Sequence, residues 1–154
     1  MSVHETYMQA ALDIARRGLA AGEPPIGAVV VRNGAVLVRA HNSVISLLDA
    51  TAHAEIVAIR ESCQQLRALQ LVDCDLYSTV EPCPMCLAAC HYAGIRHVYF
   101  GASLIEMQQI TGSELMHCTF SGVGVGTTGG VLQPESAQLL HDWIGFSGAG
   151  HTSL

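Results

Sequence analysis

Two short stretches of the chain contain the side chains that bind soft metal ions. The first, T-A-H-A-E, supplies the imidazole of His53 and the carboxylate of Glu55, and the second, E-P-C-P-M-C, supplies the thiols of Cys83 and Cys86. Zinc takes nitrogen and sulfur ligands tetrahedrally, with four protein ligands in structural sites and three plus a water in catalytic ones. One His and one C-x-x-C pair give three ligands. We therefore predict a catalytic zinc site formed by His53, Cys83 and Cys86.

Each stretch is expected to begin a helix. At a helix N-terminus the backbone N–H groups and the helix dipole favour negative charge, which keeps Cys83 and Cys86 ionised as thiolates. His53 and Glu55 lie two positions apart, so in a regular helix their side chains point about 200° from each other. We expect them to converge instead on a point beyond the end of the helix, with both helix N-termini directed at one zinc ion.

Glu55 is the predicted catalytic residue. Zinc lowers the pKa of its bound water from about 16 to about 7, so a hydroxide is available at neutral pH. Such a hydroxide can attack a ring carbon that bears an amino group. A carboxylate beside the metal but not bound to it would take the water proton, pass it to the neighbouring ring nitrogen and protonate the leaving ammonia.

Other interpretations of these residues remain open at this stage. Cys83 and Cys86 could form a thioredoxin-like redox pair, and Cys90, one turn after Cys86, could complete a structural zinc site with four ligands. Glu55 could be an acid favoured by the helix dipole, and Glu81 could serve packing, a salt bridge or substrate contact. Six further histidines have no ligand spacing with each other and are expected at the surface or in the core: His41, His91, His97, His117, His141 and His151.

Composition predicts one domain over residues 1–154. The chain is 50% hydrophobic, enough for a sizeable core, and it contains no apolar run of the roughly 20 residues that span a membrane. Residues 1–19 are typical of an amphipathic helix, not a signal peptide, so we predict a cytoplasmic protein. A Gly/Ser-rich tail over 146–154 is expected to be mobile. The four remaining cysteines are expected to be reduced and buried: Cys63, Cys74, Cys90 and Cys118.

The charge pattern argues against nucleic acid as a partner. The net charge is −6, no lysine is present, and all seven basic residues are arginines that end at Arg96. Nucleic-acid binding needs a basic surface that displaces counterions from phosphates, and the absence of lysine excludes Schiff-base chemistry on that side chain. A mean hydropathy of +0.36 is high for a monomer, so we expect an oligomer.

The order of periodic segments predicts a three-layer α/β/α sandwich with a mixed five-stranded sheet. Asn33 and Gly34 are typical of a hairpin turn, Asp49 or Thr51 is a candidate cap for the second helix, and Pro134 opens the last helix. Strands are expected at 26–31, 35–40, 76–80, 97–101 and 125–132; helices are expected at 7–19, 52–66, 83–93, within 104–109 or 114–117, and after 134.

The sequence resembles the cytidine deaminase-like superfamily, in the branch that holds nucleobase deaminases and tRNA adenosine deaminases. H-x-E followed by P-C-x-x-C is the signature of zinc-dependent base deaminases. Further matches, in order and over about residues 5–102, are P-I-G-A-V at 25–29, Asn42, L-Y at 76–77 and Y-F-G at 99–101. The resemblance implies zinc on His53, Cys83 and Cys86, Glu55 as the proton shuttle, substrate contacts from Asn42 and the Ala54 N–H, and a homodimer.

For the substrate, the resemblance implies a small nucleobase or nucleoside. Residues 58–60, 70–71, 73–74 and 82–87 are similar to bacterial guanine deaminase, and residues 41–42 and 92–95 to cytosine deaminase, which makes guanine the first candidate and cytosine the second. Segments 25–27 and 129–132 are also similar to the tRNA enzyme, so editing of a wobble adenosine is an alternative, as is a non-catalytic zinc or redox module. An aromatic side chain, Trp143 or Phe146, is expected to cover the base or to pack its helix on the sheet.

Overall fold

The computed structural model describes residues 1–112, 115, 128, 132–135 and 137. The chain divides into two units, Met1–Phe120 and Ser121–Leu154. In the second unit, residues 133–135 and 137 are helical, in agreement with the helix predicted after Pro134. The elements of the first unit are α1 (Val3–Ala20), β1 (Gly27–Arg32), β2 (Ala35–His41), α2 (Ala54–Leu66), β3 (Cys74–Val80), α3 (Pro84–Tyr92), β4 (His97–Ala102) and α4 (Leu104–Thr111).

The four strands form one mixed sheet in the order β2-β1-β3-β4. β1 pairs antiparallel with β2 and with β3, whereas β3 and β4 are parallel. The β1–β2 hairpin turns at Asn33 and Gly34, which both have positive φ, as a type I′ turn requires. The parallel β3–β4 pair needs a crossover, and α3 provides it.

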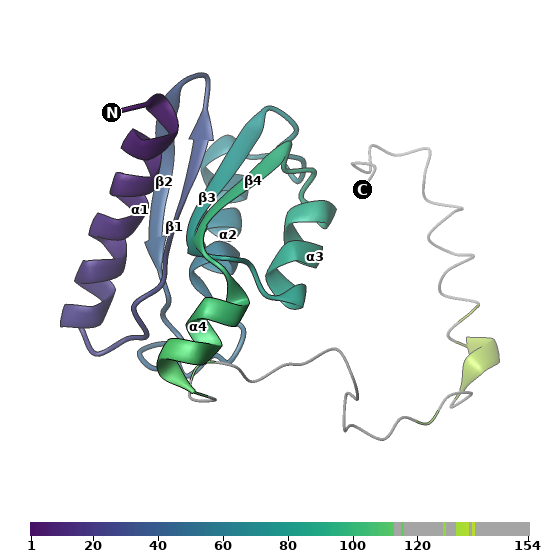
Figure 1. Ribbon diagram of the computed structural model, residues 1–154. Coiled ribbons are helices and arrows are strands. Elements are labelled where there is room, and N and C mark those ends of the chain that lie inside the picture. The colour runs from purple at the N-terminus through teal and green to yellow at the C-terminus, as the bar shows by residue number, and fades with distance from the viewer. Residues whose placement is uncertain (113–114, 116–127, 129–131, 136, 138–154) are drawn as a thin grey trace. The chain divides into compact units, whose positions relative to one another are not determined.

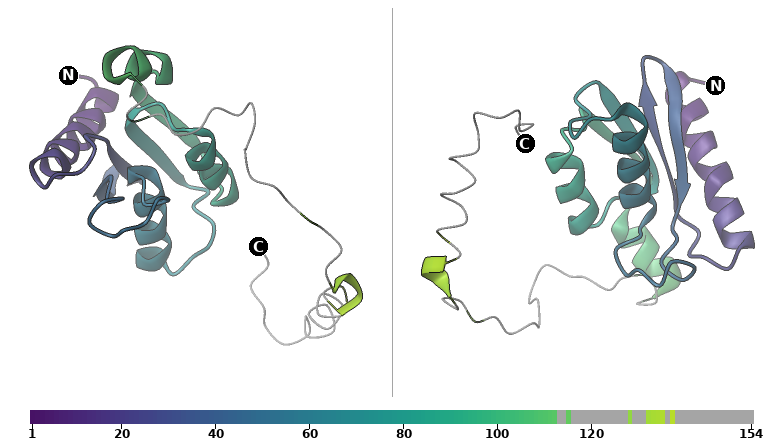
Figure 2. Two further views of the ribbon diagram at one scale, coloured as in Figure 1. Left: turned by 90° about the horizontal axis from the view of Figure 1, so that it is seen from below. Right: turned by 180° about the vertical axis from the view of Figure 1, so that it is seen from behind.

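Helices cover both faces of the sheet, as the predicted three layers require. Figure 1 shows α1 on one face and α2 with α3 on the other, and the view from behind in Figure 2 shows the same arrangement. In β1, Ala28 and Val30 face the cluster with α2 and α3, while Val29 and Val31 face α1. These four side chains are at most 4% exposed, so the strand is buried on both faces.

The predicted sheet of five strands is corrected to four strands within the described residues. The fifth strand was expected over 125–132, and of that segment only residues 128 and 132 are described; neither lies in a strand. The segment 104–109 is helical as predicted, within α4, whereas its alternative, 114–117, lies largely outside the described residues. The expected mobile tail over 146–154 lies entirely outside them, and the single domain over 1–154 stays a prediction.

The predicted cap of the second helix was wrong. The N-cap of α2 is His53, whose side chain makes no capping hydrogen bond. Asp49 Oδ1 instead accepts from the backbone N–H and the hydroxyl of Thr51. Asp49 and Thr51 therefore hydrogen-bond to each other within the loop that precedes the helix. The N-cap position is taken by His53, which is a predicted metal ligand.

No helix among the described residues is both long and apolar enough to cross a membrane. The cysteines that the structure describes are free, with Cys74, Cys86 and Cys90 buried and Cys63 and Cys83 partly buried. Cys118, the remaining cysteine, lies outside the described residues. The prediction of buried thiols is therefore confirmed for Cys74 and Cys90, whereas Cys63 is only partly buried.

Gly27→Ala is expected to destabilise the fold by about 1–3 kcal/mol or more. A Cβ atom at Gly27 would collide with the carbonyl oxygen of Ala11 and lie 2.7 Å from the N atom of Ala15, both in the backbone of α1. Gly22→Ala is the comparison: its φ of +87° costs an alanine about 1–2 kcal/mol, but no atom lies within 4 Å of the added Cβ, so this change carries the backbone cost without a collision. Urea denaturation of the two variants measures which change lowers the free energy of unfolding more. Equal unfolding midpoints for Gly27→Ala and Gly22→Ala would contradict the prediction.

Candidate metal centre

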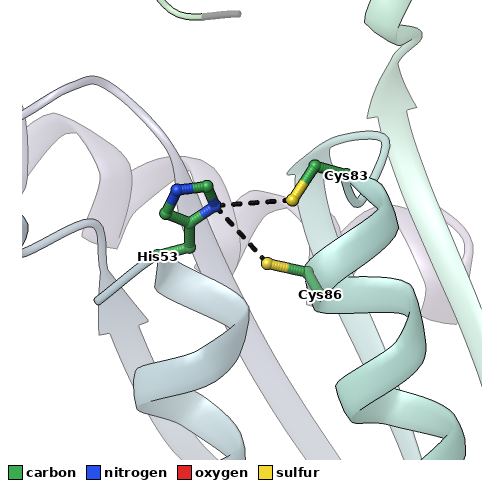
Figure 3. Close-up of side chains that lie close together, drawn as sticks. All are labelled: His53, Cys83 and Cys86. Atoms are coloured by element: carbon green, nitrogen blue, oxygen red, sulfur yellow. Dashed lines mark hydrogen bonds between the residues drawn. The ribbon is translucent and has the colours of Figure 1, made fainter. Parts of the chain in front are cut away.

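The N-termini of two helices meet at the site. His53 is the N-cap of α2 and Cys83 is the N-cap of α3, with Cys86 in the first turn of α3. Figure 3 shows the imidazole of His53, at the start of α2, directed at the sulfur atoms of Cys83 and Cys86 at the start of α3. Pro84 follows Cys83 in the first turn, where its missing N–H costs nothing. The fold thus brings the three predicted ligands together as the sequence pattern requires.

The distances between these ligand atoms fit a tetrahedral zinc ion. His53 Nδ1 lies 3.6 Å from Cys83 Sγ and 3.5 Å from Cys86 Sγ. Bond lengths of about 2.3 Å to sulfur and about 2.0 Å to nitrogen at a tetrahedral angle place such atoms about 3.5 Å apart. All three ligand atoms lie within 4.8 Å of one another, so the donor set suits zinc in both chemistry and size.

The ligand side chains interact strongly with one another. Hydrogen bonds with Cys86 and then with His53 lower the pKa of Cys83 to about 4. A hydrogen bond with Cys83 raises the pKa of His53, and the bond with Cys83 together with burial raises that of Cys86. The lowered pKa of Cys83 favours its thiolate, which is the form that binds a metal cation.

Glu55 lies beside the ligands without joining them. Within the part of the chain that the structure describes, the group of side chains able to hold a metal consists of His53, Cys83 and Cys86. Glu55 is 4% exposed, and its burial raises its pKa. Ser78 of β3, itself fully buried, donates a hydrogen bond of 3.2 Å from Oγ to Glu55 Oε1. This hydrogen bond fixes one carboxylate oxygen of Glu55 beside the ligands.

Ser78 was not identified from the sequence. It is buried in β3 between Leu76 and Val80, the apolar residues two positions away on the same face. A polar side chain at such a position indicates that a hydrogen-bond partner exists but does not identify that partner. Its hydroxyl fixes the carboxylate that the proposed chemistry requires.

Cys90 and Glu81 have structural roles. Cys90 is 3% exposed in the core cluster under α2 and α3, and burial raises its pKa to about 12, so it is a core thiol and not a fourth ligand. Glu81 Oε2 accepts the N–H of Leu104 at 3.0 Å, which satisfies a donor at the start of α4. Neither residue belongs to the metal-binding group.

Two predicted substrate contacts lie on segments next to the ligands. Asn42 follows β2 and is 4% exposed; its Oδ1 accepts the N–H of Val44 at 3.1 Å. The next residue, Ser43, donates its N–H to Ala52, directly before His53. Ala54 is the first residue of α2, where a backbone N–H has no partner within the helix. The predicted aromatic residues, Trp143 and Phe146, lie outside the described residues.

Comparisons with known proteins match this site and fold. The family model of the cytidine and deoxycytidylate deaminase zinc-binding region matches residues 1–102, which supports the predicted zinc cofactor. Guanine deaminase of Bacillus subtilis is 46% identical over 100 residues, 64% of each chain. A tRNA-specific adenosine deaminase of Aquifex aeolicus is 45% identical over 98 residues, 64% of this chain and 65% of that protein.

A solved structure of guanine deaminase from Bacillus subtilis has a TM-score of 0.83 with this chain at 33% identity, and the match covers 99% of both chains. In the sequence comparisons, by contrast, the chain spans slightly less than two thirds of the length of each of the two curated relatives. The residues that the family model matches, 1–102, include the whole metal centre.

Proposed function

The chain belongs to the cytidine and deoxycytidylate deaminase family, and from that premise we propose that it is a zinc-dependent hydrolytic deaminase of a small nucleobase. The reaction replaces an exocyclic amino group with oxygen and releases ammonia. Guanine is the first candidate substrate. The observation that carries the proposal is the His53, Cys83 and Cys86 triangle with the buried, non-ligating carboxylate of Glu55 beside it.

The side chains of this site have two roles, metal binding and proton transfer. Zinc held by the three ligands would supply a Lewis acid that makes a water molecule nucleophilic at neutral pH. Glu55 accepts one proton of the attacking water and delivers it to the ring nitrogen next to the reacting carbon. It then takes the second proton from the same oxygen, as that oxygen becomes the carbonyl, and gives it to the amino group, which leaves as ammonia. Ser78 keeps the Glu55 carboxylate oriented through these transfers.

Guanine is favoured by the extent of the structural match. The similarity to the guanine deaminase structure extends over 99% of both chains, and residues 58–60, 70–71 and 73–74 share its sequence pattern. The absence of lysine, and of arginine after Arg96, suits a free base better than a polyanion. Cytosine remains the second candidate, on the pattern at 41–42 and 92–95. We further propose a homodimer and a cytoplasmic location.

Editing of tRNA is the second candidate function. The Aquifex aeolicus enzyme, named as a tRNA-specific adenosine deaminase, matches at 45% identity, close to the 46% of guanine deaminase. The expectation that nucleic acid is not a partner is therefore unsupported. A basic surface assembled from two copies of the chain would reconcile a tRNA substrate with the net charge of −6. A thioredoxin-like or structural zinc module is disfavoured by the placement of Glu55 and Cys90.

Ammonia release from a panel of substrates tests the proposal. We expect zinc-loaded protein to deaminate guanine with kcat/KM at least about tenfold above that for cytosine, adenine, isocytosine, aminotriazines, the matching nucleosides or unmodified tRNA. The matched control is protein carrying Glu55→Gln. Turnover of tRNA alone would overturn the small-substrate proposal, and no turnover of any member by zinc-loaded protein would overturn the deaminase proposal.

A further inference from the structure

Glu23 is a buried carboxylate that the proposed chemistry does not use. It lies in the loop after α1, where its backbone N–H donates to Gly18 at 2.9 Å, and it is 3% exposed. Its two carboxylate oxygens accept backbone N–H groups from a different loop: Ser46 at 2.6 Å and Ile45 at 3.0 Å. Although burial acts to raise the pKa of Glu23, these hydrogen bonds lower it overall. Glu23 is therefore an ionised clamp on that loop.

The clamped loop, residues 42–49, has few apolar contacts of its own. Ile45 and Leu47 are 59% exposed and Leu48 is 93% exposed, so hydrophobic packing does not fix the tip. At the tip, residues 44–48, the other hydrogen bonds stay within the loop, as from Leu47 to Ser43 and from Asp49 to Val44. Bonds to a charged acceptor are stronger than neutral ones. Glu23 is thus a principal link between the loop tip and the rest of the fold.

The loop begins at Asn42, the residue that the family resemblance assigns to substrate binding. Asn42 Oδ1 accepts the N–H of Val44, the residue directly before the two that Glu23 holds. The amide oxygen of Asn42 is therefore oriented by the same turn, which leaves its NH₂ group as the donor toward a ligand. On the other side, Ser43 is bonded to Ala52, next to the metal ligand His53.

We propose that Glu23 is a positioning residue: by holding Ile45 and Ser46 it fixes the turn that orients Asn42 toward the substrate. The inference rests on the proposed function, because it assigns Asn42 to substrate binding. The side-chain hydrogen bonds of Glu23 go to Ile45 and Ser46, and not to the metal ligands or to Glu55. Its loss should therefore weaken substrate binding and leave both the zinc site and the chemical step in place.

Glu23→Gln in the full-length, zinc-loaded protein tests this role. Gln keeps one carbonyl acceptor but replaces the other with an NH₂ group that repels a backbone N–H. We expect KM for guanine to rise about tenfold with kcat within about threefold, the signature of lost ground-state binding, and zinc to remain near one per chain. Glu61→Gln, the same change at an exposed position of α2, is the control and should change neither constant.

A double-mutant cycle identifies the route of the effect. If Glu23 acts through Asn42, Glu23→Gln should raise KM by less than about twofold when introduced into the Asn42→Ala variant, because the two residues act as one unit. A full tenfold rise on that background would overturn the proposal. Ser46→Pro removes the donor from the other side of the clamp and should reproduce the KM increase if Glu23→Gln proves unstable.

Hydrogen exchange tests the clamp independently of activity. The amides of Ile45 and Ser46 should exchange at least about tenfold faster in Glu23→Gln than in the wild type, while those of the central strand β1 keep their protection. Unchanged exchange at both amides would overturn the positioning role, even in a protein that deaminates none of the substrates. Failure of the proposed function alone would leave this exchange difference intact, so the two failures are distinguishable.

Discussion

Glu55→Gln is expected to keep zinc near one ion per chain and to lose about 10²–10⁴-fold in kcat. Gln preserves the size of the side chain and can still accept the hydrogen bond of the Ser78 hydroxyl, which is 3.2 Å from Glu55 Oε1. It cannot take a proton from water or return one to the leaving amino group. The loss should therefore appear in kcat and kcat/KM together, measured by ammonia release on protein of known zinc content.

The control for this change is Glu61→Gln in the same helix, at an exposed position, which should retain full activity and full zinc content. A Glu55→Gln protein that retains kcat within about tenfold of the wild type would remove Glu55 from the proton-transfer role. Loss of zinc in Glu55→Gln would instead make Glu55 a ligand, contrary to the metal-binding group that the described residues form.

The ligands could be predicted from sequence because the requirements for zinc are local. The C-x-x-C pair places two sulfurs on one helical turn, and a helix N-terminus stabilises their negative charge. Only the approach of His53 to Cys83 and Cys86 is long-range. A catalytic zinc site needs three protein ligands, so two cysteines alone already imply that a third ligand such as His53 must lie close to them. The start of α2 was misassigned for the same reason: His53 takes the N-cap position as a candidate ligand, where rules for capping favour Asp49 or Thr51.

The supporting residues could not be predicted because their partners are distant in the chain. Glu23 is bonded to Ser46 across two elements, and Ser78 of β3 is bonded to Glu55 of α2. No periodicity or spacing connects such pairs. Helical and strand periodicity predicted the three layers, while the fifth strand depended on the glycine-rich segment 125–132, where the pattern is weak. Net charge described the composition of the chain and not where a polyanion would lie, so it did not decide between a base and tRNA.

Cys83→Ala is expected to reduce zinc content from about one ion to less than about 0.1 per chain and to abolish turnover. The change removes one of three ligands, a larger loss than that of an outer hydrogen-bond partner, which alone weakens metal binding about 10–100-fold. It also removes the thiol whose pKa is lowered to about 4 by its bonds with Cys86 and His53. Metal analysis of purified, dialysed protein measures the first effect and ammonia release the second.

Cys90→Ala is the matched control, because Cys90 lies one turn beyond Cys86 but belongs to the core cluster. That change should keep zinc and activity and lower the thermal midpoint modestly, as loss of a small buried side chain does. Loss of zinc in both variants would indicate a structural site with four ligands. Retention of zinc in Cys83→Ala would contradict the assignment of this thiol, and a metal-free wild type with a reducible bond between Cys83 and Cys86 would indicate redox chemistry in place of hydrolysis.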